Sequence, residues 1–509
     1  MSLTPNGNAV DWFLDRHVRE GRGARVAFSD GTRSLTYAAL HAETVRVAAA
    51  LAANGIGRER RVGLLLLDTL EFPAVFWGCL RAGVIPVPIN TLLPPELAGY
   101  ILADCRAEAV FVSEPLYAPL AATLAGVRRV VRAGAAGVSG WDAFLAQGGA
   151  DAETVVASPD EVAMWFYSSG STGAPKGVKH VHGSLRATAD TYAAQVLGIR
   201  ETDVVYSAAK LFFAYGFGNS AMFPMSVGAS SVLLAGRPTV EAVMGLMQSA
   251  QPTIFCGVPT LYAALLAQSG LGPGAGSARL RLCVSAGEAL PETIGLRWRE
   301  RVGVEILDGI GSTEMLHIFL SNRPGGIRYG TTGRAVPGYD LRIVDAEGRD
   351  VPDEDSGELI VRGPSAAEGY WNQRDKSRRT FRGEWTYTGD TYSRDAQGYY
   401  RYGGRSDDMM KVSGIWVSPF EVEAALAAHE AVLEAAVVGH AGADGLIKPR
   451  AFVVLKHADA AAESLAEALK QHVKDRAGPW KYPRWIEFVE TLPKTATGKI
   501  QRFKLRDLA

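Results

Sequence analysis

The sequence predicts an α/β protein with a large N-terminal domain of two doubly wound α/β lobes plus a small β-barrel section, and a mobile C-terminal α+β domain. Three observations lead to this prediction. Buried apolar runs alternate with helical stretches on both sides of a Gly/Ser-rich loop at residues 167–177. Residues 330–403 are instead rich in Gly, Asp and aromatic residues, and the chain from Asp407 alternates again. With 509 residues, the chain is long enough for about three domain-sized units.

The first lobe is predicted to alternate strands with covering helices. The succession of strand, helix and strand from Val62 to Ile89 forms a βαβ unit, which implies parallel strands under a helix. The expected elements are a helix over 36–56, strand Val62–Leu67, helix Phe72–Ala82, and strands Ile85–Ile89, Val110–Val112 and Val127–Val131.

The second lobe repeats this alternation after the Gly/Ser-rich loop. Short apolar runs mark its strands, and longer periodic stretches mark its helices. The expected elements are strands Val204–Ser207, Ser231–Leu234, Ile254–Cys256 and Leu282–Ser285, and helices Val240–Ala250 and Pro291–Arg301. We therefore expect one doubly wound lobe on each side of the loop.

The remaining chain is predicted to form two smaller units. Short strands such as Leu341–Val344 and Glu358–Arg362 indicate an antiparallel or barrel-like section. Two glycines and two acidic residues at 403–408 permit a large backbone change, so we place the domain boundary between 1–404 and 405–509, with a hinge near Asp407. The last segment is expected to contain a helix over 418–428, strands Ala435–Gly439 and Arg450–Leu455, a helix over 462–476, strand Trp485–Val489 and a basic tail.

Composition excludes several classes of protein. Hydrophobic residues make up 47% and charged residues 21%, as in a well-cored soluble protein, and the formal net charge of -1 gives no case for nucleic acid or an anionic membrane. The apolar region Val62–Ile89 is interrupted by charges and a proline, so no membrane span is expected. The four cysteines lack metal-site spacing and the N-terminus lacks a signal pattern, which favours a cytoplasmic protein with reduced thiols.

The loop from Ser168 to Gly177 has the composition of a nucleotide-phosphate site. It packs three glycines, four hydroxyls and one lysine into ten residues. Glycine lets backbone N–H groups approach a ligand, hydroxyls can surround a phosphate chain, and lysine adds a positive charge. The loop is not a Walker A loop, because Gly177 follows Lys176 where that pattern requires Ser or Thr. The plain alternative is an ordinary Gly/Ser hairpin loop.

The residues around this loop indicate its structural setting. The run Val162–Tyr167 is apolar and strand-like, and Val178–His182 again looks extended. The loop is therefore predicted to join two strands, with Ser184 as the cap of the next helix. His180 and His182 would share a strand face, but no further ligands that would complete a zinc site stand nearby.

A second run, from Asp308 to Glu314, follows the strand-like Val304–Leu307. Glycines, hydroxyls and a carboxylate at the carboxyl end of a strand lie where α/β folds bind ligands. Thr313 could contact phosphate and Glu314 could hold Mg²⁺. A helix N-terminus capped by Ser312 is an equally good interpretation.

Three further patterns each allow two interpretations. Asp390 in Tyr387–Asp390 could bind both ribose hydroxyls with help from Arg405, or could form an Asx-turn. The lysines of Pro493–Lys499 could act on a ligand or lie in a solvated basic tail. The segment Leu211–Asn219 interleaves four aromatic residues with small ones, which predicts either a flat slot or an ordinary aromatic core.

Taken in order, these runs resemble a known superfamily. The loop at 167–177, the run at 311–314, YTGD at 387–390, GRSDD at 404–408 and PKTATGK at 493–499 resemble the adenylate-forming acyl-CoA synthetases, peptide-synthetase adenylation domains and luciferases. The segments KLFFAYGFGN at 210–219 and STEMLHIF at 312–319 further resemble benzoate-CoA ligases and relatives acting on hydroxy- or aminobenzoates. Serines stand at 169 and 171 where many relatives have threonine, which retains the hydroxyl chemistry.

The resemblance implies a role for each candidate residue. Lys499, Glu314 and Thr313 are the implied catalytic residues, with Glu314 also binding Mg²⁺ and Lys499 reaching the carboxylate and the α-phosphate. The implied ATP-binding residues are Ser168, Ser169, Gly170, Ser171, Thr172, Gly173, Lys176, Gly287, Glu288, Ala289, Asp308, Gly309, Ile310, Gly311, Ser312, Asp390 and Arg405. The implied acid-pocket residues are Phe213, Ala214, Tyr215, His317 and Ile318. The implied coenzyme A tunnel contains Lys411, Ser413, Gly414 and Trp416, and Asp407 is the implied hinge.

The expected activity is an ATP-dependent ligation of an aryl carboxylate to coenzyme A through an acyl-adenylate. A benzoate-like acid is already ionised at neutral pH, so it needs charge neutralisation and alignment rather than a general base. The expected ligands are a small aromatic acid, ATP, Mg²⁺ and coenzyme A, and a homodimer is compatible with the sequence. Two alternatives stay open: an adenylation enzyme that loads a carrier-protein thiol, and a degenerate nucleotide-binding regulatory protein.

Overall fold

The first lobe is built on a four-stranded parallel sheet, as predicted. The computed structural model describes residues 6–134, 137, 140–149, 151–170, 173–405, 408–412, 415–442, 446–457, 461, 463–478, 480–494 and 500–508. The sheet order is β4 (Ile85–Pro88), β3 (Arg61–Leu65), β5 (Ala109–Ser113) and β6 (Arg129–Ala133). The accompanying helices are α2 (Tyr37–Ala53), α3 (Glu71–Arg81), α4 (Pro95–Asp104), α5 (Glu114–Leu124) and α6 (Trp141–Leu145).

Local signals explain why these elements begin where they do. Thr36 caps α2 by accepting a hydrogen bond from the amide of Ala39. Helix α3 is buried along almost its whole length, and Gly78 lies against Val47 of α2, where a Cβ would come within 2.6 Å. The close approach of these two helices therefore depends on glycine at this position.

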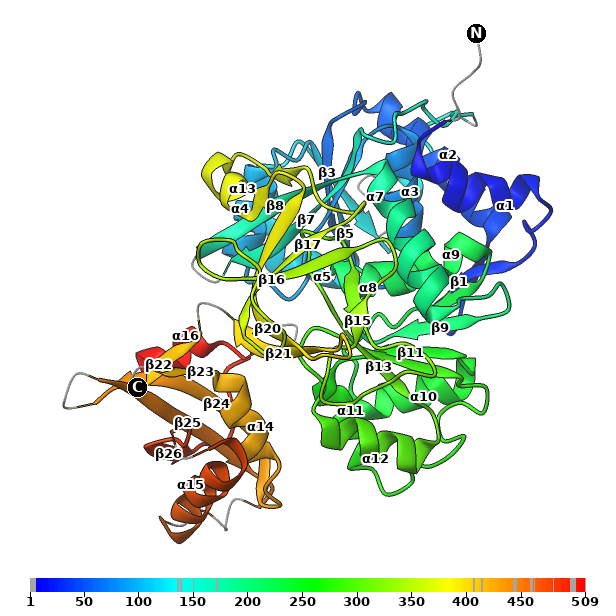
Figure 1. Cartoon of the computed structure of the whole chain (residues 1–509). Helices are drawn as coiled ribbons and strands as arrows, with labels where there is room; N and C mark the ends of the chain where they lie inside the picture. Colours follow the sequence, from blue (N-terminus) through cyan, green and yellow to red (C-terminus); the bar gives the residue numbers. More distant parts are fainter. Residues whose placement is uncertain are drawn as a thin grey trace.

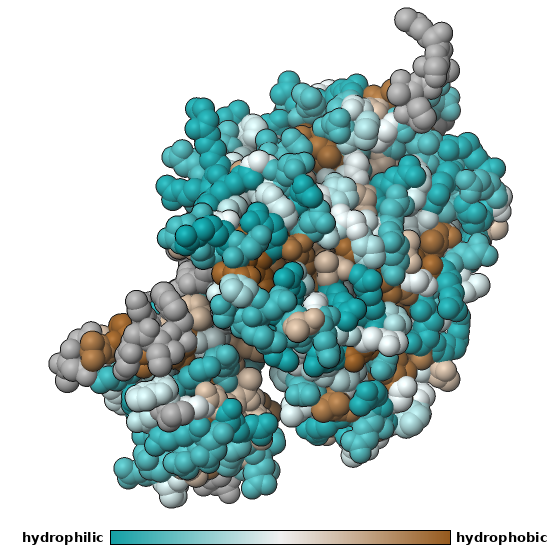
Figure 2. Space-filling model, in the orientation of Figure 1, coloured by the Kyte–Doolittle hydropathy of each residue, from teal (hydrophilic) through white to brown (hydrophobic). Residues whose placement is uncertain are grey.

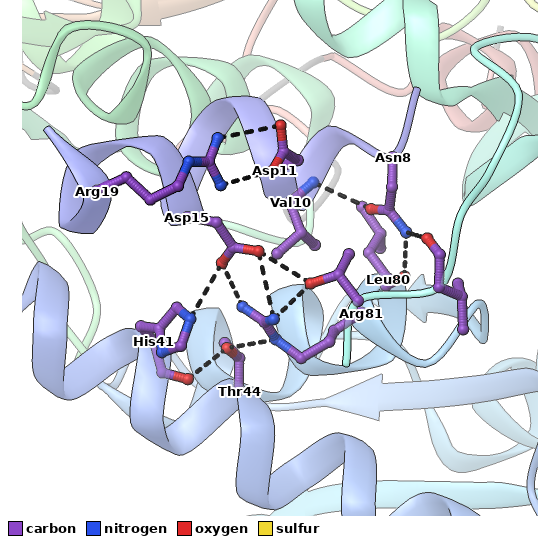
Figure 3. A network of polar contacts seen from close by, with 11 residues as sticks. Asn8, Val10, Asp11, Asp15, Arg19, His41, Thr44, Leu80 and Arg81 are labelled. Carbon is purple, nitrogen blue, oxygen red and sulfur yellow. Dashed lines mark hydrogen bonds and ion pairs between the residues drawn. The ribbon is translucent and has the colours of Figure 1, made fainter. Parts of the chain in front are cut away.

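A buried polar network fixes the N-terminal segment to this lobe (Figure 3). Asp15, in the π-helix η1 (Asp11–Asp15), forms an ion pair with Arg81 of α3, which also donates to Thr44 of α2 at 3.1 Å. Asn8 donates to the carbonyl of Leu80 at 2.9 Å. Because Arg81 is almost fully buried, its charge requires these partners.

The Gly/Ser-rich loop joins two antiparallel strands, as predicted. These strands are β7 (Val162–Gly170) and β8 (Gly173–Val181), and β18 (Gly369–Tyr370) pairs with the outer edge of β8. The prediction for Ser184 was wrong. The next helix, α7 (His182–Thr188), begins two residues earlier, so Ser184 lies inside it and His182 is helical rather than on a strand face with His180.

The second lobe contains a nine-stranded sheet. Its order is β15 (Arg334–Ala335), β14 (Ile318–Ser321), β13 (Ile306–Gly311), β12 (Leu282–Ser285), β11 (Ile254–Gly257), β9 (Val204–Ser207), β10 (Ser230–Val232), β1 (Val26–Ser29) and β2 (Ser34–Thr36). The strands from β13 to β1 are parallel, and the outer pairings are antiparallel. The lobes are therefore not divided cleanly by the loop, because β1 and β2 precede it in the chain yet complete the second sheet.

Strand periodicity divides the second lobe into two cores. Phe255 and Cys283 face a core with helices α10 (Val240–Ala250), α11 (Pro259–Leu266) and α12 (Glu292–Val302), whereas Cys256 and Val284 join the main core on the other side. Alternate residues of a strand point to opposite faces, so each strand contributes to both layers. The main core also contains residues from η2 (Ala189–Leu197), α8 (Ala214–Phe217), η3 (Gly218–Met222) and α9 (Phe223–Val227).

A five-stranded antiparallel sheet follows, which confirms the antiparallel section predicted for residues 330–403. It contains β16 (Asp340–Val344), β17 (Gly357–Arg362), β20 (Trp385–Arg394), β19 (Phe381–Arg382) and β21 (Tyr400–Arg405), with α13 (Arg374–Thr380) before β19. Figure 1 shows β20 and β21 reaching toward the C-terminal part of the chain.

The C-terminal part is α+β, as predicted, and lies beside the large N-terminal part (Figure 1). It contains the pair β22 (Met410–Val412) and β23 (Ile415–Val417), the sheet β24 (Val432–Ala441), β25 (Ile447–Leu455) and β26 (Trp485–Phe488), and helices α14 (Pro419–Ala427), α15 (Glu463–Ala477) and α16 (Arg502–Asp507). It has its own hydrophobic core. Residues such as Val437, Ala451 and Leu469 form this core.

The surface and the thiols agree with the composition. Figure 2 shows one face of the molecule, which is mostly hydrophilic with apolar residues gathered near its middle. All four cysteines are buried and free. Within the described residues, no helix combines the length and the apolar character that crossing a membrane would require.

Candidate active site

The β7–β8 hairpin places the phosphate-loop residues on two paired strands. Ser168 and Lys176 lie directly opposite each other in the antiparallel register, and Gly170 lies opposite Gly173. The Ser168 hydroxyl is buried and has no hydrogen-bond partner among the described residues. A buried hydroxyl normally finds a partner, so this position fits a ligand oxygen. Ser169 lies in β7, whereas Ser171 and Thr172 fall outside the described residues.

Lys176, Tyr370 and Glu314 form a closed polar triangle beside this hairpin. The Lys176 ammonium lies 3.1 Å from Oε1 of Glu314 and donates to the Tyr370 hydroxyl at 2.7 Å. The Tyr370 hydroxyl in turn lies 2.8 Å from the same Glu314 oxygen. Burial alone would raise the pKa of Glu314, but the charge of Lys176 and the hydrogen bond from Tyr370 outweigh it and hold that pKa below its ordinary value. Glu314 is therefore a carboxylate at neutral pH.

The segment that carries Glu314 is a tight turn, not a helix. Ser312 accepts from the amide of Met315 at 3.2 Å, and Leu316 has a left-handed backbone with φ 65°. A left-handed Leu prevents a helix from continuing, so the interpretation of Ser312 as a helix cap was wrong. Nε2 of His180 bonds the carbonyl of Thr313 at 2.7 Å, which links this turn to β8.

Asp308, Gly309 and Ile310 lie within β13 rather than after a strand, which corrects the predicted position. Parallel pairing with β12 ends at Asp308, and the chain then pairs antiparallel with β14 through Gly309 and Ile310. This second pairing extends β13 beyond the carboxyl edge of the parallel sheet, where α/β folds bind ligands. Oδ1 of Asp308 is buried without a partner in the described chain, and burial raises the pKa of this carboxyl well above its ordinary value.

Gly287, Glu288 and Ala289 follow β12 at the same edge of the sheet. Gly287 has φ 95°, a conformation that side-chain-bearing residues rarely adopt. Gly311 lies against the backbone of His317, where a Cβ would come within 2.5 Å of its carbonyl oxygen. These glycines let the chain pass closely around the end of the strands.

Asp390 and Arg405 lie opposite each other in the β20–β21 pair. Nη1 of Arg405 lies 3.3 Å from Oδ1 of Asp390 and donates to the carbonyl of Thr388 at 2.9 Å. The Thr388 hydroxyl accepts from the amide of Asp390 at 3.1 Å, so the local turn uses Thr388 rather than an Asx-turn of Asp390. Burial raises the pKa of Tyr370, and the charge of Arg405 acts in the opposite direction, so Arg405 lies within electrostatic range of the Lys176 triangle.

The predicted acid-pocket residues come together from two distant segments. His317 Nε2 lies 3.3 Å from the carbonyl of Tyr215, and the two rings are 5.8 Å apart. The Tyr215 hydroxyl lies 3.1 Å from the carbonyls of Gly257 and Val284, at the ends of β11 and β12. Phe213 and Ala214 precede Tyr215 and are half-buried, while Ile318 is buried beside Gly309.

His317 is a neutral, buried imidazole. Burial lowers its pKa to about 3, although the hydrogen bond to the Tyr215 carbonyl acts in the opposite direction. Because that carbonyl can only accept, Nε2 carries the proton and Nδ1 is an acceptor. Nδ1 has no partner among the described residues. Gly218 covers the ring, since a Cβ there would come within 2.3 Å of Cδ2.

A separate cavity of about 530 Å³ contains none of the predicted site residues. Arg362, Phe381 and Trp385 are among its lining residues. It adjoins the site through Ala367, whose amide donates to the carbonyl of Glu314 at 2.8 Å, and through Phe381, whose ring lies 5.4 Å from that of Tyr370. The site is therefore recognised by its polar groups and not by this cavity.

The remaining predicted residues lie in or near the C-terminal part. Lys411 and Trp416 are paired across the β22–β23 hairpin. Ser413, Gly414, Asp407 and Lys499 fall outside the described residues, so their predicted roles stay predictions.

No sequence pattern identified Tyr370, Thr380 or His180 as a member of the site. Tyr370 reaches Lys176 only because β18 pairs with β8 across almost two hundred residues of chain. The local sequence around Tyr370 offers one signal, the preceding Gly369, whose backbone has φ 126°. Thr380 lies 3.3 Å from the Tyr370 hydroxyl.

The described residues fit ATP together with a magnesium ion. Ser168 and Asp308 offer buried atoms without partners, and Lys176 offers a positive charge beside the glycine hairpin. No group of three or more His, Cys, Asp and Glu side chains in the described part of the chain could hold a metal by itself. One carboxylate, Glu314, agrees with the way Mg²⁺ binds through one or two carboxylates and substrate phosphates.

This combination of two α/β lobes, a glycine hairpin with a lysine and a carboxylate opposite it is that of an enzyme that activates acids with ATP. The chain belongs to the AMP-binding enzyme family, whose model matches residues 14–371, and the model of the AMP-binding enzyme C-terminal domain matches residues 421–499. It is an AMP-forming acid–thiol ligase.

Individual relatives are similar over nearly the whole chain. A benzoate–CoA ligase of Thauera aromatica is 53% identical over 98% of this chain and 95% of its own length. A 4-hydroxybenzoate–CoA/benzoate–CoA ligase of Rhodopseudomonas palustris is 51% identical over 100% of this chain and 95% of its own length. Among solved structures, a benzoate CoA ligase from Burkholderia xenovorans LB400 matches with a TM-score of 0.92 and 49% identity, covering 98% of this chain and 99% of that one.

Proposed function

We propose that this protein is an ATP-dependent aryl carboxylate–CoA ligase that acts on benzoate or a substituted benzoate and releases AMP and pyrophosphate. The observation that carries the proposal is the wall formed by Ala214 and Tyr215 against His317, at the edge where the parallel strands end. Identity of 53% and 51% to ligases named for benzoate supports the same class of acid.

In the first half-reaction, the carboxylate of the acid attacks the α-phosphorus of ATP and pyrophosphate leaves. Ser168 and Lys176 would bind the phosphate chain, and Asp390 with Arg405 would bind the ribose. The main difficulty is to bring two anions together, so positive charge and alignment supply most of the acceleration. Lys499 is proposed to bring the charge to the reacting carboxylate and α-phosphate.

In the second half-reaction, the thiol of coenzyme A attacks the carbonyl carbon of the acyl-adenylate and AMP leaves. The proposed thiol tunnel is bordered by Lys411, Ser413, Gly414 and Trp416 of the C-terminal domain. A domain boundary near Asp407 would let this domain present Lys499 in one step and the tunnel in the other.

Magnesium would be held by Glu314 and would neutralise charge on the phosphates. Thr313 lies next to Glu314 in the same turn and is proposed to contact phosphate. Location in the cytoplasm and assembly into a homodimer stay predictions.

A panel of acids tests this function. We expect AMP release in the presence of ATP, Mg²⁺ and coenzyme A with benzoate, 2-aminobenzoate or 4-hydroxybenzoate, and much less with octanoate. Acid-dependent pyrophosphate exchange without coenzyme A would report the first half-reaction separately. Faster turnover of octanoate than of all three aryl acids would contradict the proposed substrate class.

The same panel distinguishes the thiol acceptor. Thioester formation with free coenzyme A is expected, because the relatives from Thauera aromatica and Rhodopseudomonas palustris, at 53% and 51% identity, are named CoA ligases. Pyrophosphate exchange without thioester formation on free coenzyme A would instead favour a carrier-protein acceptor.

A further inference from the structure

The Tyr370 hydroxyl lies at the centre of the Lys176–Glu314 pair, yet no sequence pattern assigned it a role. It lies 2.7 Å from the Lys176 ammonium and 2.8 Å from Oε1 of Glu314. The ammonium also lies 4.0 Å from the centre of the Tyr370 ring, a cation–π contact. Tyr370 is only 5% exposed. Both the ring and the hydroxyl therefore contact residues proposed to bind ATP.

Counting donors fixes the direction of these hydrogen bonds. A lysine ammonium can only donate, so the Tyr370 oxygen accepts from Lys176. The single phenol proton then goes to the Glu314 carboxylate, and the Thr380 hydroxyl at 3.3 Å acts as a further donor rather than an acceptor. Burial and the Glu314 charge raise the pKa of Tyr370, while the pKa of Glu314 is lowered. The phenol is therefore protonated and the carboxylate ionised at neutral pH.

The two groups joined by Tyr370 come from different sheets. Lys176 lies on β8, and β18 is fixed to that strand by pairing of Tyr370 with Val178 and by a 2.8 Å bond from the Trp371 amide to the Gly177 carbonyl. Glu314 belongs to the turn after β13 of the second lobe. The phenol is thus a rigid bridge between the phosphate hairpin and the turn that carries the carboxylate.

We propose that Tyr370 is a positioning residue that holds Lys176 and Glu314 in place for the phosphates of ATP, a role that rests on the proposed function. Tyr370 and Lys176 both engage Oε1. Without the hydroxyl, this oxygen keeps only the flexible lysine of its two described side-chain partners. The ammonium then collapses onto the carboxylate instead of reaching a phosphate.

The test removes one oxygen atom. Tyr370→Phe keeps the ring, its cation–π contact with Lys176 and its packing at 5.4 Å from Phe381. The matched control is Tyr37→Phe, which removes a buried hydroxyl that donates to the Ala229 carbonyl at 2.7 Å, between the start of α2 and the residue before β10. Thermal unfolding of both variants measures the structural cost of losing a buried hydroxyl.

The main readout is equilibrium binding of ATP by calorimetry without acid, once with Mg²⁺ and once with EDTA. We expect Tyr370→Phe to weaken ATP binding about tenfold or more, because hydrogen bonds to charged groups are stronger than neutral ones. In steady-state assays KM for ATP should rise while KM for the acid changes by less than about twofold. Tyr37→Phe should change neither.

A double-mutant cycle separates positioning from packing. In a Glu314→Gln background, the Tyr370→Phe change should weaken ATP binding much less than in the wild type, because the carboxylate that it positions is gone. If Tyr370→Phe bound ATP as tightly as the wild type, or if the two effects in the cycle were fully additive, the positioning role of Tyr370 would be overturned. The proposed function would not be affected. Absence of ATP binding by the wild-type protein would instead overturn the proposed function.

Discussion

Ala214 is the smallest side chain of the proposed acid wall and separates Phe213 from Tyr215. Phe213, Ala214 and Tyr215 are all half-buried, so they keep some surface toward the site. We expect Ala214→Phe to raise KM for benzoate about tenfold or more, because added bulk in a packed site costs about 1–3 kcal/mol. KM for ATP should stay within about twofold, measured in the same AMP-release assay.

Ala214→Ser is the matched control, since it adds one oxygen and keeps the wall open. It should behave nearly as the wild type. An equal rise in KM for ATP and for benzoate in Ala214→Phe would show that the residue does not belong to the acid pocket.

His317 presents an acceptor, Nδ1, at the ring end of the proposed pocket. His317→Ala should change the ratio of kcat/KM values for substituted and unsubstituted benzoates, because the ring and its acceptor would both be lost. Since burial lowers the pKa of His317 to about 3, the wild-type ratio should be flat between pH 6 and 9. A uniform loss on every acid in the panel would favour a packing role.

At the scale of elements, the sequence predicted structure well wherever the signal is local. The β7–β8 hairpin, the βαβ unit and strands such as β12 follow from apolar runs bounded by turn residues. The Thr313–His317 turn could not be predicted, because the left-handed backbone of Leu316 has no signature in its own residue type. Likewise β1 joins the second sheet by pairing with β10, a contact that no local pattern shows.

The same division applies to the candidate site. Residues supplied by one continuous run, such as Ser168 and Lys176, were found from their composition. Tyr370 and His180 were missed because their partners come from other elements, and only the pairing of sheets brings them together. Pairing between strands that are distant in the sequence depends on how the faces of whole sheets pack. It leaves no pattern of residues at a fixed spacing in a single sequence.

The element that carries Ala214 and Tyr215 is anchored at its start by a buried carboxylate of the first lobe. Oδ1 of Asp68 accepts from the Leu211 amide at 3.2 Å, and Oδ2 lies 4.0 Å from the Lys210 ammonium. Gly216 packs on the Lys210 carbonyl, where a Cβ would come within 2.1 Å. A displacement of residues 210–211 would therefore also displace Ala214 and Tyr215, which form the proposed acid wall.

We expect Asp68→Asn to raise KM for the acid about threefold to tenfold and to leave ATP binding unchanged, because the change loses a charge pair without a large change in volume. The matched control is Asp203→Asn, a carboxylate that is similarly buried and pairs with Arg281 at 2.6 Å before β9. It should lower the melting temperature without changing KM for the acid. Equal kinetic effects of both variants would argue against an anchoring role for Asp68.

At the scale of the whole molecule, four buried histidines make the fold sensitive to acid. Burial lowers the pKa of His17, His180 and His182 to about 4 and of His317 to about 3. An unfolded histidine has a pKa of about 6.5, so between these values the unfolded chain binds more protons than the folded one. The free energy of unfolding must therefore fall as pH decreases below 6.5, by up to about 1.4 kcal/mol per pH unit for each histidine.

Asp68 and Asp308 act in the opposite direction, because burial raises the pKa of Asp68 to about 6 and that of Asp308 well above its ordinary value, so folding favours their protonated forms at low pH. The four histidines outnumber these two carboxyls, so net proton uptake on unfolding is expected between pH 6.5 and 4.5, measured by calorimetry in buffers of different ionisation enthalpy. His17→Gln, far from the site, should reduce this uptake by about one proton. No uptake in the wild type would contradict the neutral, buried state of these histidines.

Arg405 and Asp408 make their described contacts with different parts of the chain. Arg405 bonds to Asp390 and Thr388 of the large domain. Asp408 forms ion pairs with Arg502 and Arg506 of α16, and Arg502 also pairs with Glu423 of α14 at 2.7 Å. Asp408 is therefore bound to the C-terminal part of the chain, which also includes Lys499. This supports the proposal of a hinge at Asp407.

If the C-terminal domain serves both half-reactions, substitutions at Lys499 and at Asp407 should each impair a different half-reaction. Lys499→Ala should lose pyrophosphate exchange by about 10²–10³, the usual cost of one preorganised charge contact in a transition state, yet convert supplied benzoyl-AMP to the thioester. Asp407→Pro fixes φ near −65° and should spare pyrophosphate exchange while thioester formation from benzoyl-AMP falls on the order of 10²-fold, because the tunnel cannot reach the adenylate. Both half-reactions are measured separately in both variants. Parallel losses in the two assays would mean that Lys499 and Asp407 do not divide the steps between them, and normal thioester formation in Asp407→Pro would place the hinge at another residue.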